Sequence, residues 1–296
     1  MPGYDLIAID LDGTLLDSCR RVSRVNVAAV HAAREAGIQV VVCTGRGLVE
    51  SAEALSAIAQ TDPVVVAGGS IISCPVTTRT LHRFSLNRTF VERAVPRLVS
   101  HGHPVMILKD PIEAGYDYLI VHGEEKHELD PVTQWWFEKM KVRVRYVEHL
   151  HEDEHPEHSV RLGVCALSGV LEAVHGDIHA SFGEDATMHH FPAVLEPQHQ
   201  DRIPPGQKLH ILEVFDRTAS KWSAIRWLAD QRGIPTERIC AIGDEINDLS
   251  MIRGAGLGVA MGNAVPSVKS AAARHTRTND EDGVSHAIHN ILGDLW

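Results

Sequence analysis

Continuous runs of apolar residues predict four strands in the first and last thirds of the chain. These runs are Leu6–Ile9, Ile38–Val42, Ile239–Ile242 and Leu257–Ala260. Apolar runs without alternation are typical of strands buried on both faces, as in a parallel sheet covered by helices. Between the first two runs, Val25–Ala36 has helical apolar spacing and stops at Gly37. The order strand, helix, strand predicts a right-handed βαβ unit.

Further elements extend this predicted sheet. Leu48–Ile58 has the spacing of a helix, Pro63–Ala67 is a third apolar strand, and Ser220-Lys221 opens an amphipathic helix over Trp222–Arg232. His210–Phe215 is apolar and strand-like, and we assign it to the returning sheet.

The middle of the chain has a different pattern. Short apolar segments predict strands at Val105–Leu108, Tyr118–His122, Val142–Val147, Val160–Leu167 and Met188–Val194, and helices at Thr89–Ser100, interrupted by Pro96, and Leu171–Ala180. Mixed elements in this order suggest an inserted α+β domain. We therefore predict an α/β protein whose Rossmann-like parallel-sheet core consists of residues 1–85 and 209–296. Residues 86–208 form the predicted insertion.

Polar side chains that can carry out chemistry follow the predicted core strands. Asp10 and Asp12 come after the first strand, Thr44 after the second, and Asp244 and Asp248 after Ile239–Ile242. The carboxyl ends of parallel strands meet at one edge of a sheet, where such folds bind ligands. Carboxylates gathered there are costly unless a cation meets them. Lys221, at the start of its predicted helix, supplies one ammonium.

Each of these residues also has an ordinary structural explanation. A single Asp after a strand usually accepts hydrogen bonds from loop amides. Thr44 is also a plausible N-cap of the next helix, and a lysine at a helix start is usually a surface charge. The convergence of four positions on one edge favours a functional site.

The chemistry available to this set is phosphoryl transfer. Oxygen ligands with waters suit Mg²⁺, whereas Zn²⁺ would need His or Cys. A metal ion between Asp10 and a phosphate, with Lys221 opposite, would cancel the repulsion between nucleophile and substrate, which is the main requirement of such reactions. Asp10 would then form an aspartyl-phosphate, and Asp12 would act as general acid and base.

The motifs DLDGTLLDS, GDEINDLSM, GVAMGNA and NDEDGV, together with Lys221, resemble the haloacid dehalogenase superfamily. They look like its Cof-like branch, whose members carry a large α+β cap domain. The resemblance covers both core segments from end to end, and in the cap it rests on position and size. Family members commonly have Asn-Gly-Ala where this chain has Gly68-Gly69-Ser70.

This resemblance implies a role for each matching residue. Asp10 would be the nucleophile, and Asp12 would be the acid/base and would bind Mg²⁺ through its backbone carbonyl. Asp10 and Asp244 would be the other metal ligands, with Asp248 in support. Thr44 and Lys221 would hold the phosphoryl group. We add Gly45, which follows Thr44, and Asn247, which lies in GDEINDLSM, as candidate phosphate-binding residues and Arg46 as a candidate substrate contact.

Three functions are compatible with these residues. The first is a Mg²⁺-dependent phosphatase acting on small phosphorylated metabolites such as sugar phosphates. The second is a phosphomutase or phosphotransferase that passes the same aspartyl-phosphate to a sugar hydroxyl. The third is a non-catalytic protein that binds phosphometabolites, which the full set of reactive residues disfavours. The sequence names neither the substrate nor the cap residues that would recognise it.

The composition of the chain limits the kinds of partner that we expect it to bind. The formal net charge of −11 argues against nucleic acid, because binding a phosphate backbone needs basic patches. We expect no membrane partner, since the chain has neither a long apolar run nor a signal-like N-terminus. The five cysteines are scattered without CxxC pairs, which favours a reduced, cytoplasmic protein. The sequence leaves the oligomeric state open.

One segment of the middle region, Glu148–His158, is rich in histidine and carboxylate side chains. Its four histidines are His149, His151, His155 and His158. Such spacing can hold a transition metal. We interpret it as a solvated acidic loop, because it contains Pro156 and nearly no apolar residues, and metal binding remains the alternative.

Overall fold

The structure is a computed structural model that describes residues 3–193, 203–204 and 206–296. It divides into two compact units. The core unit contains the chain up to His82 together with Ser220–Trp296, and the cap unit contains Arg83–Ala219. The predicted α/β core interrupted by an α+β insertion is confirmed.

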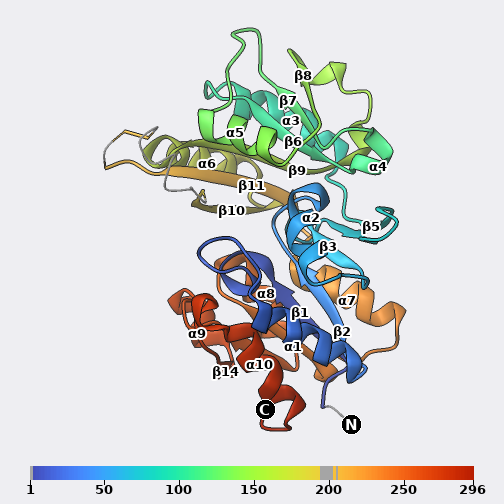
Figure 1. Cartoon of the computed structure of the whole chain (residues 1–296). Coiled ribbons are helices and arrows are strands. Elements are labelled where there is room, and N and C mark those ends of the chain that lie inside the picture. The colour runs from blue at the N-terminus through green and yellow to red at the C-terminus, as the bar shows by residue number, and fades with distance from the viewer. Residues whose placement is uncertain (1–2, 194–202, 205) are drawn as a thin grey trace. The chain divides into compact units, whose positions relative to one another are not determined.

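The core unit is built on a sheet of eight strands in the order β14-β13-β12-β1-β2-β3-β4-β5 (Figure 1). The strands are β1 (Leu6–Asp10), β2 (Gln39–Cys43), β3 (Val64–Val66), β4 (Ile71–Ser73), β5 (Thr80–Arg83), β12 (Ile239–Gly243), β13 (Leu257–Ala260) and β14 (Arg274–His275). The pairs from β14 through β3 are parallel, and β4 runs antiparallel to β3. Every residue of β1 and β12 is buried, as the continuous apolar runs predict.

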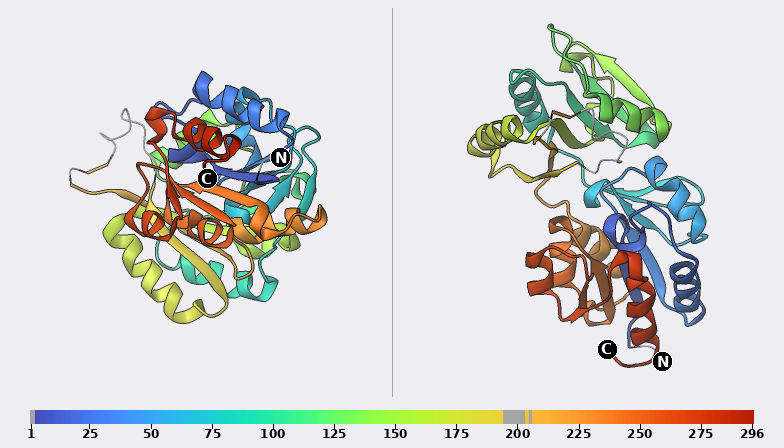
Figure 2. Two further views of the ribbon diagram at one scale, coloured as in Figure 1. Left: turned by 90° about the horizontal axis from the view of Figure 1, so that it is seen from below. Right: turned by 60° about the vertical axis from the view of Figure 1, so that its left-hand side comes forward.

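Helices cover both faces of this sheet. They are α1 (Arg24–Glu35), α2 (Leu48–Ala57), α7 (Lys221–Gln231), α8 (Leu249–Gly254), α9 (Pro266–Ala271) and α10 (Gly283–Leu292). In the left view of Figure 2, α1 and α10 lie side by side above the sheet, and α7, α8 and α9 lie below it. The carboxyl ends of β1, β2 and β12 therefore share one edge between two helical layers.

The cap unit has a second sheet in the order β10-β11-β9-β6-β7-β8. Its strands are β6 (Val105–Lys109), β7 (Tyr118–Val121), β8 (Val144–Val147), β9 (Ser159–Leu167), β10 (Ala186–Pro192) and β11 (Leu209–Asp216). Its helices are α3 (Arg88–Val99), α4 (Pro111–Ala114), α5 (Pro131–Lys139) and α6 (Ser168–Phe182). Alternate residues of the strands pack with α3 and α6 into one apolar core. Phe137 of α5 packs on Tyr118 of β7, on the opposite face.

Two expectations about these elements are wrong. Strand β11, which we had assigned to the core sheet, pairs with β9 and β10 in the cap sheet, so the chain returns to the core unit at Ser220 and not near Leu209. The alternating apolar pattern of this strand is compatible with either sheet, and only its pairing partners determine the sheet to which it belongs. Helix α3 continues through Pro96, although proline lacks the N–H that would donate to the carbonyl of Glu92 at this position.

Two further points concern the limits of the elements. The last residue of the predicted strand Met188–Val194 lies outside the described residues. Among the described residues, no helix is long and apolar enough to cross a membrane.

Candidate active site

Asp10 ends β1 at the centre of the core sheet and faces a fully buried lysine. The Nζ of Lys221 lies 2.5 Å from Oδ1 of Asp10 and 2.5 Å from Oδ1 of Asp248. The Lys221 side chain has no exposed surface, although we noted that a lysine at a helix start is usually exposed. Ser220 caps the helix by accepting a hydrogen bond from the Ser223 amide, which fixes the start of α7 and so the origin of the Lys221 side chain.

Burial and neighbouring charge shift the pKa values of this cluster. Burial raises the pKa of Asp10 well above its usual range, and the carboxylates of Asp248 and Asp244 raise it further against the opposing effect of Lys221. Burial and Asp248 together raise the pKa of Asp244 to about 7. Burial alone would lower the pKa of Lys221, but Asp10 and Asp248 outweigh it and raise that pKa. The ammonium is therefore retained, while the raised pKa values of Asp10 and Asp244 mean that one ammonium does not offset the burial and mutual repulsion of the carboxylates.

Asp244 is held in place by groups from two loops. Its Oδ1 accepts a hydrogen bond from the Thr14 hydroxyl at 2.9 Å, and its Oδ2 accepts one from Nδ2 of Asn263 at 3.3 Å. Gly13, with φ of +75°, passes so close that a Cβ there would lie 2.3 Å from Oδ2 of Asp244. Only glycine fits this turn, and it brings Asp244 beside the segment that follows Asp10.

A divalent cation suits this donor set. One oxygen from each of Asp10, Asp244 and Asp248 lies within 4.8 Å of the others. Both oxygens of Asp248 are already engaged, Oδ1 by Lys221 and Oδ2 by the amides of Asp244 and Glu245. Asp10 and Asp244 thus fit as ligands, and Asp248 fits as their support. A site with only oxygen donors favours a hard cation.

The carboxylate of Asp12 lies against Arg46. Nε of Arg46 donates to Oδ2 of Asp12 at 2.8 Å, and a second guanidinium nitrogen donates to Oδ1. We had assigned Arg46 as a candidate substrate contact, and this pairing was not foreseen. A bidentate arginine fixes the orientation of a carboxylate as well as attracting it. The Asp12 side chain is therefore oriented toward Arg46 in this conformation.

The remaining residues assigned to phosphate lie at the same sheet edge. Thr44 follows β2 and is buried, and its hydroxyl accepts a hydrogen bond from the Arg46 amide at 3.1 Å. It does not cap α2, whose N-cap is Gly47. A Cβ on Gly45 would lie 3.9 Å from Nδ2 of Asn247, so these two residues are neighbours. Oδ1 of Asn247 is buried and has no hydrogen-bond partner among the described residues.

The two glycines after β3 bring the loop against the start of α7. Gly69 has φ of +105°, and a Cβ there would lie 2.1 Å from the carbonyl carbon of Ser220. No side chain fits at this position without displacing the backbone. Gly68 offers no side chain for a contact at the first position, while Gly69 allows the helix that carries Lys221 to approach.

Sequence reasoning missed Thr14 and Asn263 as partners of Asp244. Thr14 lies in the motif DLDGTLLDS and Asn263 in GVAMGNA, so the sequence indicated their importance. Their contacts with Asp244 became apparent only from the three-dimensional structure. Nδ2 of Asn263 also donates to the carbonyl of Gly13 at 2.8 Å, which ties the β13 loop to the β1 loop.

Comparison with known proteins decides the family. A family model described as haloacid dehalogenase-like hydrolase matches residues 7–288. The chain belongs to this family. As a haloacid dehalogenase-like hydrolase it has the fold that its motifs imply, and the expected resemblance is confirmed.

Relatives of this haloacid dehalogenase-like hydrolase match almost end to end. "Phosphatase YwpJ" of Bacillus subtilis is 31% identical over 297 residues, covering 97% of this chain and 99% of its own. "5-amino-6-(5-phospho-D-ribitylamino)uracil phosphatase YitU" of the same organism is 30% identical, with 96% of each chain covered. A solved haloacid dehalogenase-like hydrolase from Bacteroides thetaiotaomicron superposes with a TM-score of 0.77 at 26% identity, covering 97% of this chain and 99% of that one. The similarity therefore includes the cap unit as well as the core unit.

Proposed function

We propose that this hydrolase is a Mg²⁺-dependent phosphatase that removes phosphate from small phosphorylated metabolites, in particular sugar phosphates. Asp10 is the nucleophile, and the reaction passes through an aspartyl-phosphate on its carboxylate. Family membership supports the hydrolase class, and the relatives named as phosphatases support the phosphate ester as substrate.

The observation that carries this proposal is the charge balance of the buried cluster. Asp10, Asp244 and Asp248 face one another around a single ammonium, that of Lys221. Three carboxylates against one lysine leave excess negative charge that a divalent cation would neutralise. Asp10, the backbone carbonyl of Asp12 and Asp244 would hold Mg²⁺, which when bound neutralises charge between Asp10 and the phosphoryl group.

In the first step an oxygen of Asp10 attacks phosphorus and the ester bond to the leaving group breaks. Lys221 and Thr44 hold the phosphoryl oxygens, and Asp12 in its protonated form gives its proton to the departing oxygen. In the second step water attacks phosphorus, Asp12 takes the proton of that water, and the bond between phosphorus and Asp10 breaks. Inorganic phosphate leaves, and Asp10 returns to its starting state.

Arg46 gives Asp12 a switchable environment in this scheme. The guanidinium holds the Asp12 carboxylate by a bidentate pair. A phosphoryl dianion entering beside Asp10 would compete for the same guanidinium, which frees the Asp12 side chain to turn toward the leaving oxygen. Arg46 is then a positioning residue for the acid/base and a contact for the substrate.

A screen of phosphorylated metabolites tests this function. Purified protein is assayed for phosphate release with Mg²⁺ and with a chelator, on sugar phosphates, on a phosphorylated ribityl compound and on a nitrophenyl ester. We expect turnover only with Mg²⁺. Parallel reactions with an acceptor sugar show whether the phosphoryl group passes to a hydroxyl, the result expected of a mutase or phosphotransferase.

Two variants assign the roles. Asp10→Asn removes the attacking charge and a metal ligand, so turnover should vanish, whereas Asp17→Asn in the same motif should stay close to wild type. Asp12→Ala should lose roughly 10²–10⁴-fold, and less on a nitrophenyl ester, whose leaving group needs no proton. Comparable turnover of Asp10→Asn and wild type would overturn the mechanism.

A further inference from the structure

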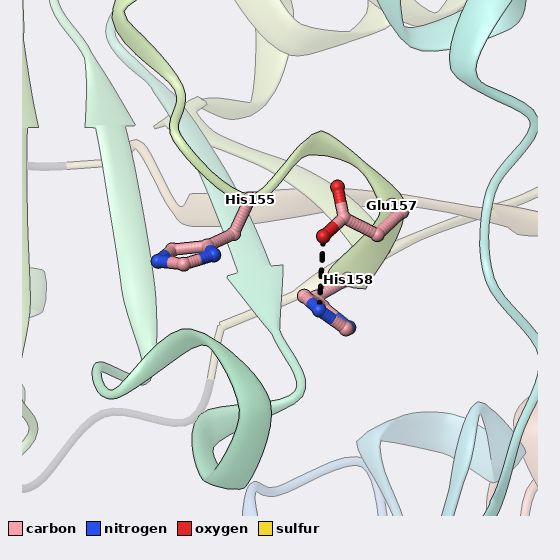
Figure 3. Close-up of side chains that lie close together, drawn as sticks. All are labelled: His155, Glu157 and His158. Atoms are coloured by element: carbon pink, nitrogen blue, oxygen red, sulfur yellow. Dashed lines mark ion pairs between the residues drawn. The ribbon is translucent and has the colours of Figure 1, made fainter.

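The cap unit contains a second group of metal-binding side chains that the phosphatase reaction does not use. One donor atom from each of His155, Glu157 and His158 lies within 4.8 Å of the others. Figure 3 shows Glu157 and His158 pointing toward each other, with one ring nitrogen of His155 on the side of that pair. Nε2 of His158 lies 3.0 Å from Oε1 of Glu157.

A buried lysine, Lys109, holds the turn that carries these side chains. Lys109 has no exposed side-chain surface, and its Nζ donates to Oδ2 of Asp153 at 2.5 Å, to the His155 carbonyl at 3.1 Å and to Oγ of Ser159 at 2.8 Å. These three contacts hold the chain on both sides of the turn Pro156–His158.

Backbone contacts complete the framework. The His155 amide donates to Oδ1 of Asp153 at 3.0 Å, and the His158 carbonyl accepts from the Asp110 amide at 2.9 Å. The segment is thus an ordered loop with a buried anchor, and several of its acidic side chains are exposed, as its composition suggests.

His158 carries an unsatisfied nitrogen. Its Nδ1 is buried and has no hydrogen-bond partner among the described residues, while its Nε2 faces Glu157. A buried polar atom without a partner costs free energy. Either ring nitrogen of a neutral histidine can bind a metal. Nε2 of His158, on the side of Glu157, is the nitrogen that a cation shared with this carboxylate would bind.

The charge around the turn favours a cation. Lys109 and Asp153 cancel each other, and Glu154 is paired with Arg145 through two contacts. The carboxylate of Glu157 then contributes a net negative charge beside two imidazoles. Two imidazoles and one carboxylate are ligands that Zn²⁺ accepts and that Mg²⁺ does not prefer.

We propose that His155, Glu157 and His158 form a Zn²⁺ site in the cap unit, separate from the acidic cluster of the core unit. In a tetrahedral site with bonds of about 2.0–2.2 Å, ligand atoms lie roughly 3.4 Å apart. Nε2 of His158 and Oε1 of Glu157, 3.0 Å apart, lie slightly closer than this spacing, and small rotations of these side chains and of the His155 ring would bring the three donors to it. Water or a ligand atom of another molecule completes the fourth position.

Calorimetric titration of the full-length protein with Zn²⁺, in saturating Mg²⁺ to fill the core cluster, tests this site. We expect one Zn²⁺ per chain in the wild type. Glu157→Gln, a change at an exposed side chain, and His155→Ala should each weaken binding at least tenfold, since losing even an outer partner of a metal ligand costs that much. Mg²⁺-dependent turnover should stay unchanged in both.

The same segment offers a matched control. His149 and His151 stack on each other with ring centroids 5.2 Å apart, outside the proposed ligand set. His149→Ser with His151→Ser should keep full Zn²⁺ affinity. Histidine NMR of the wild type should show His155 and His158 shifting on Zn²⁺ addition and His149 and His151 unmoved. Absence of Zn²⁺ binding in the wild type, or equal losses in the control and in Glu157→Gln, would overturn the proposal.

Discussion

Two lysines, one in each unit, are fully buried and have opposite electrostatic outcomes. Lys221 in the core unit faces the carboxylates of Asp10 and Asp248, and they raise its pKa despite burial. Lys109 in the cap unit faces one carboxylate, that of Asp153, with a carbonyl and a hydroxyl. There burial outweighs the carboxylates of Asp153 and Glu157 and lowers the pKa of Lys109. Two carboxylates in direct contact offset the cost of burying Lys221, whereas Lys109 has one such contact.

The largest effect is expected from removing the core lysine. Lys221→Met leaves Asp10 and Asp248 buried without their counter-charge, and the phosphoryl group loses a donor. Turnover should fall by about 10²–10³-fold, as for other lost transition-state donors. The free energy of unfolding should drop by about 3–5 kcal/mol. Steady-state kinetics and urea denaturation measure both, and turnover within a few fold of wild type would contradict the role of Lys221.

The equivalent change in the cap unit should affect stability alone. Lys109→Met leaves Asp153 buried and unpaired, so the free energy of unfolding should also drop by about 3–5 kcal/mol. Turnover of the folded fraction should equal that of the wild type, because Lys109 contacts only groups of the turn. Added Mg²⁺ should narrow the stability deficit of Lys221→Met relative to the wild type and leave that of Lys109→Met unchanged, because Lys109→Met keeps the same core cluster as the wild type. If Mg²⁺ narrowed the stability deficit of both variants equally, Lys221 would not differ from Lys109 in its relation to the metal site.

These two lysines also show how far sequence reasoning reaches. The strands β1, β2, β12 and β13 follow from continuous apolar runs, and the reactive residues follow from their positions at the strand ends. Lys221 was singled out by its motif. Lys109 was not noticed, because a lysine ending an apolar strand gives no local sign of burial. Its environment depends on Asp153 and Ser159, which the fold brings together across the cap sheet.

Pairing between distant segments limited the prediction elsewhere. The pattern of β11 identifies a strand but not the sheet to which it belongs, since β9 and β10 supply its partners. The pair of Arg46 and Asp12 is similarly invisible, because it depends on the direction in which a loop arginine turns. Local patterns therefore predicted the elements and a candidate site, whereas tertiary contacts determined the domain boundary and the partner of Asp12.

A smaller effect should follow from changing the carboxylate excess of the core cluster. Asp244→Ala removes a proposed ligand while Lys221 keeps both of its carboxylates. The Mg²⁺ concentration for half-maximal turnover should rise by at least tenfold, and by more if the ligand is essential. A Mg²⁺ titration of activity measures this, with Glu245→Gln as the neighbouring control. An unchanged Mg²⁺ requirement would remove Asp244 from the metal site.

The smallest expected effect concerns the pH dependence of stability and a partly buried histidine of the cap unit. Burial lowers the pKa of His190, and the neighbouring His210 and His175 lower it further, against the weaker opposing effect of Glu172. Between this lowered value and the unfolded value near 6.5, the unfolded chain binds more protons, so stability falls as the pH decreases through that window.

His190→Gln should therefore reduce the loss of unfolding free energy between about pH 7 and pH 5. Urea denaturation at several pH values measures the slope. The exposed His151 of the same unit provides a control, and His151→Gln should leave the slope close to that of the wild type. If both variants keep the wild-type pH dependence, burial does not govern His190.

Gly69 contacts none of the proposed reacting groups, yet the position of the Lys221 ammonium depends on it. Its backbone lies directly against the carbonyl of Ser220, the residue before the lysine. The loop after β3 therefore acts as a spacer of fixed thickness between two backbones. A methyl group added there would move the first turn of α7 away from the sheet and carry the ammonium with it. The rate of turnover could thus be changed by altering the distance between the β3 loop and the start of α7, without replacing any acidic, basic or charged residue.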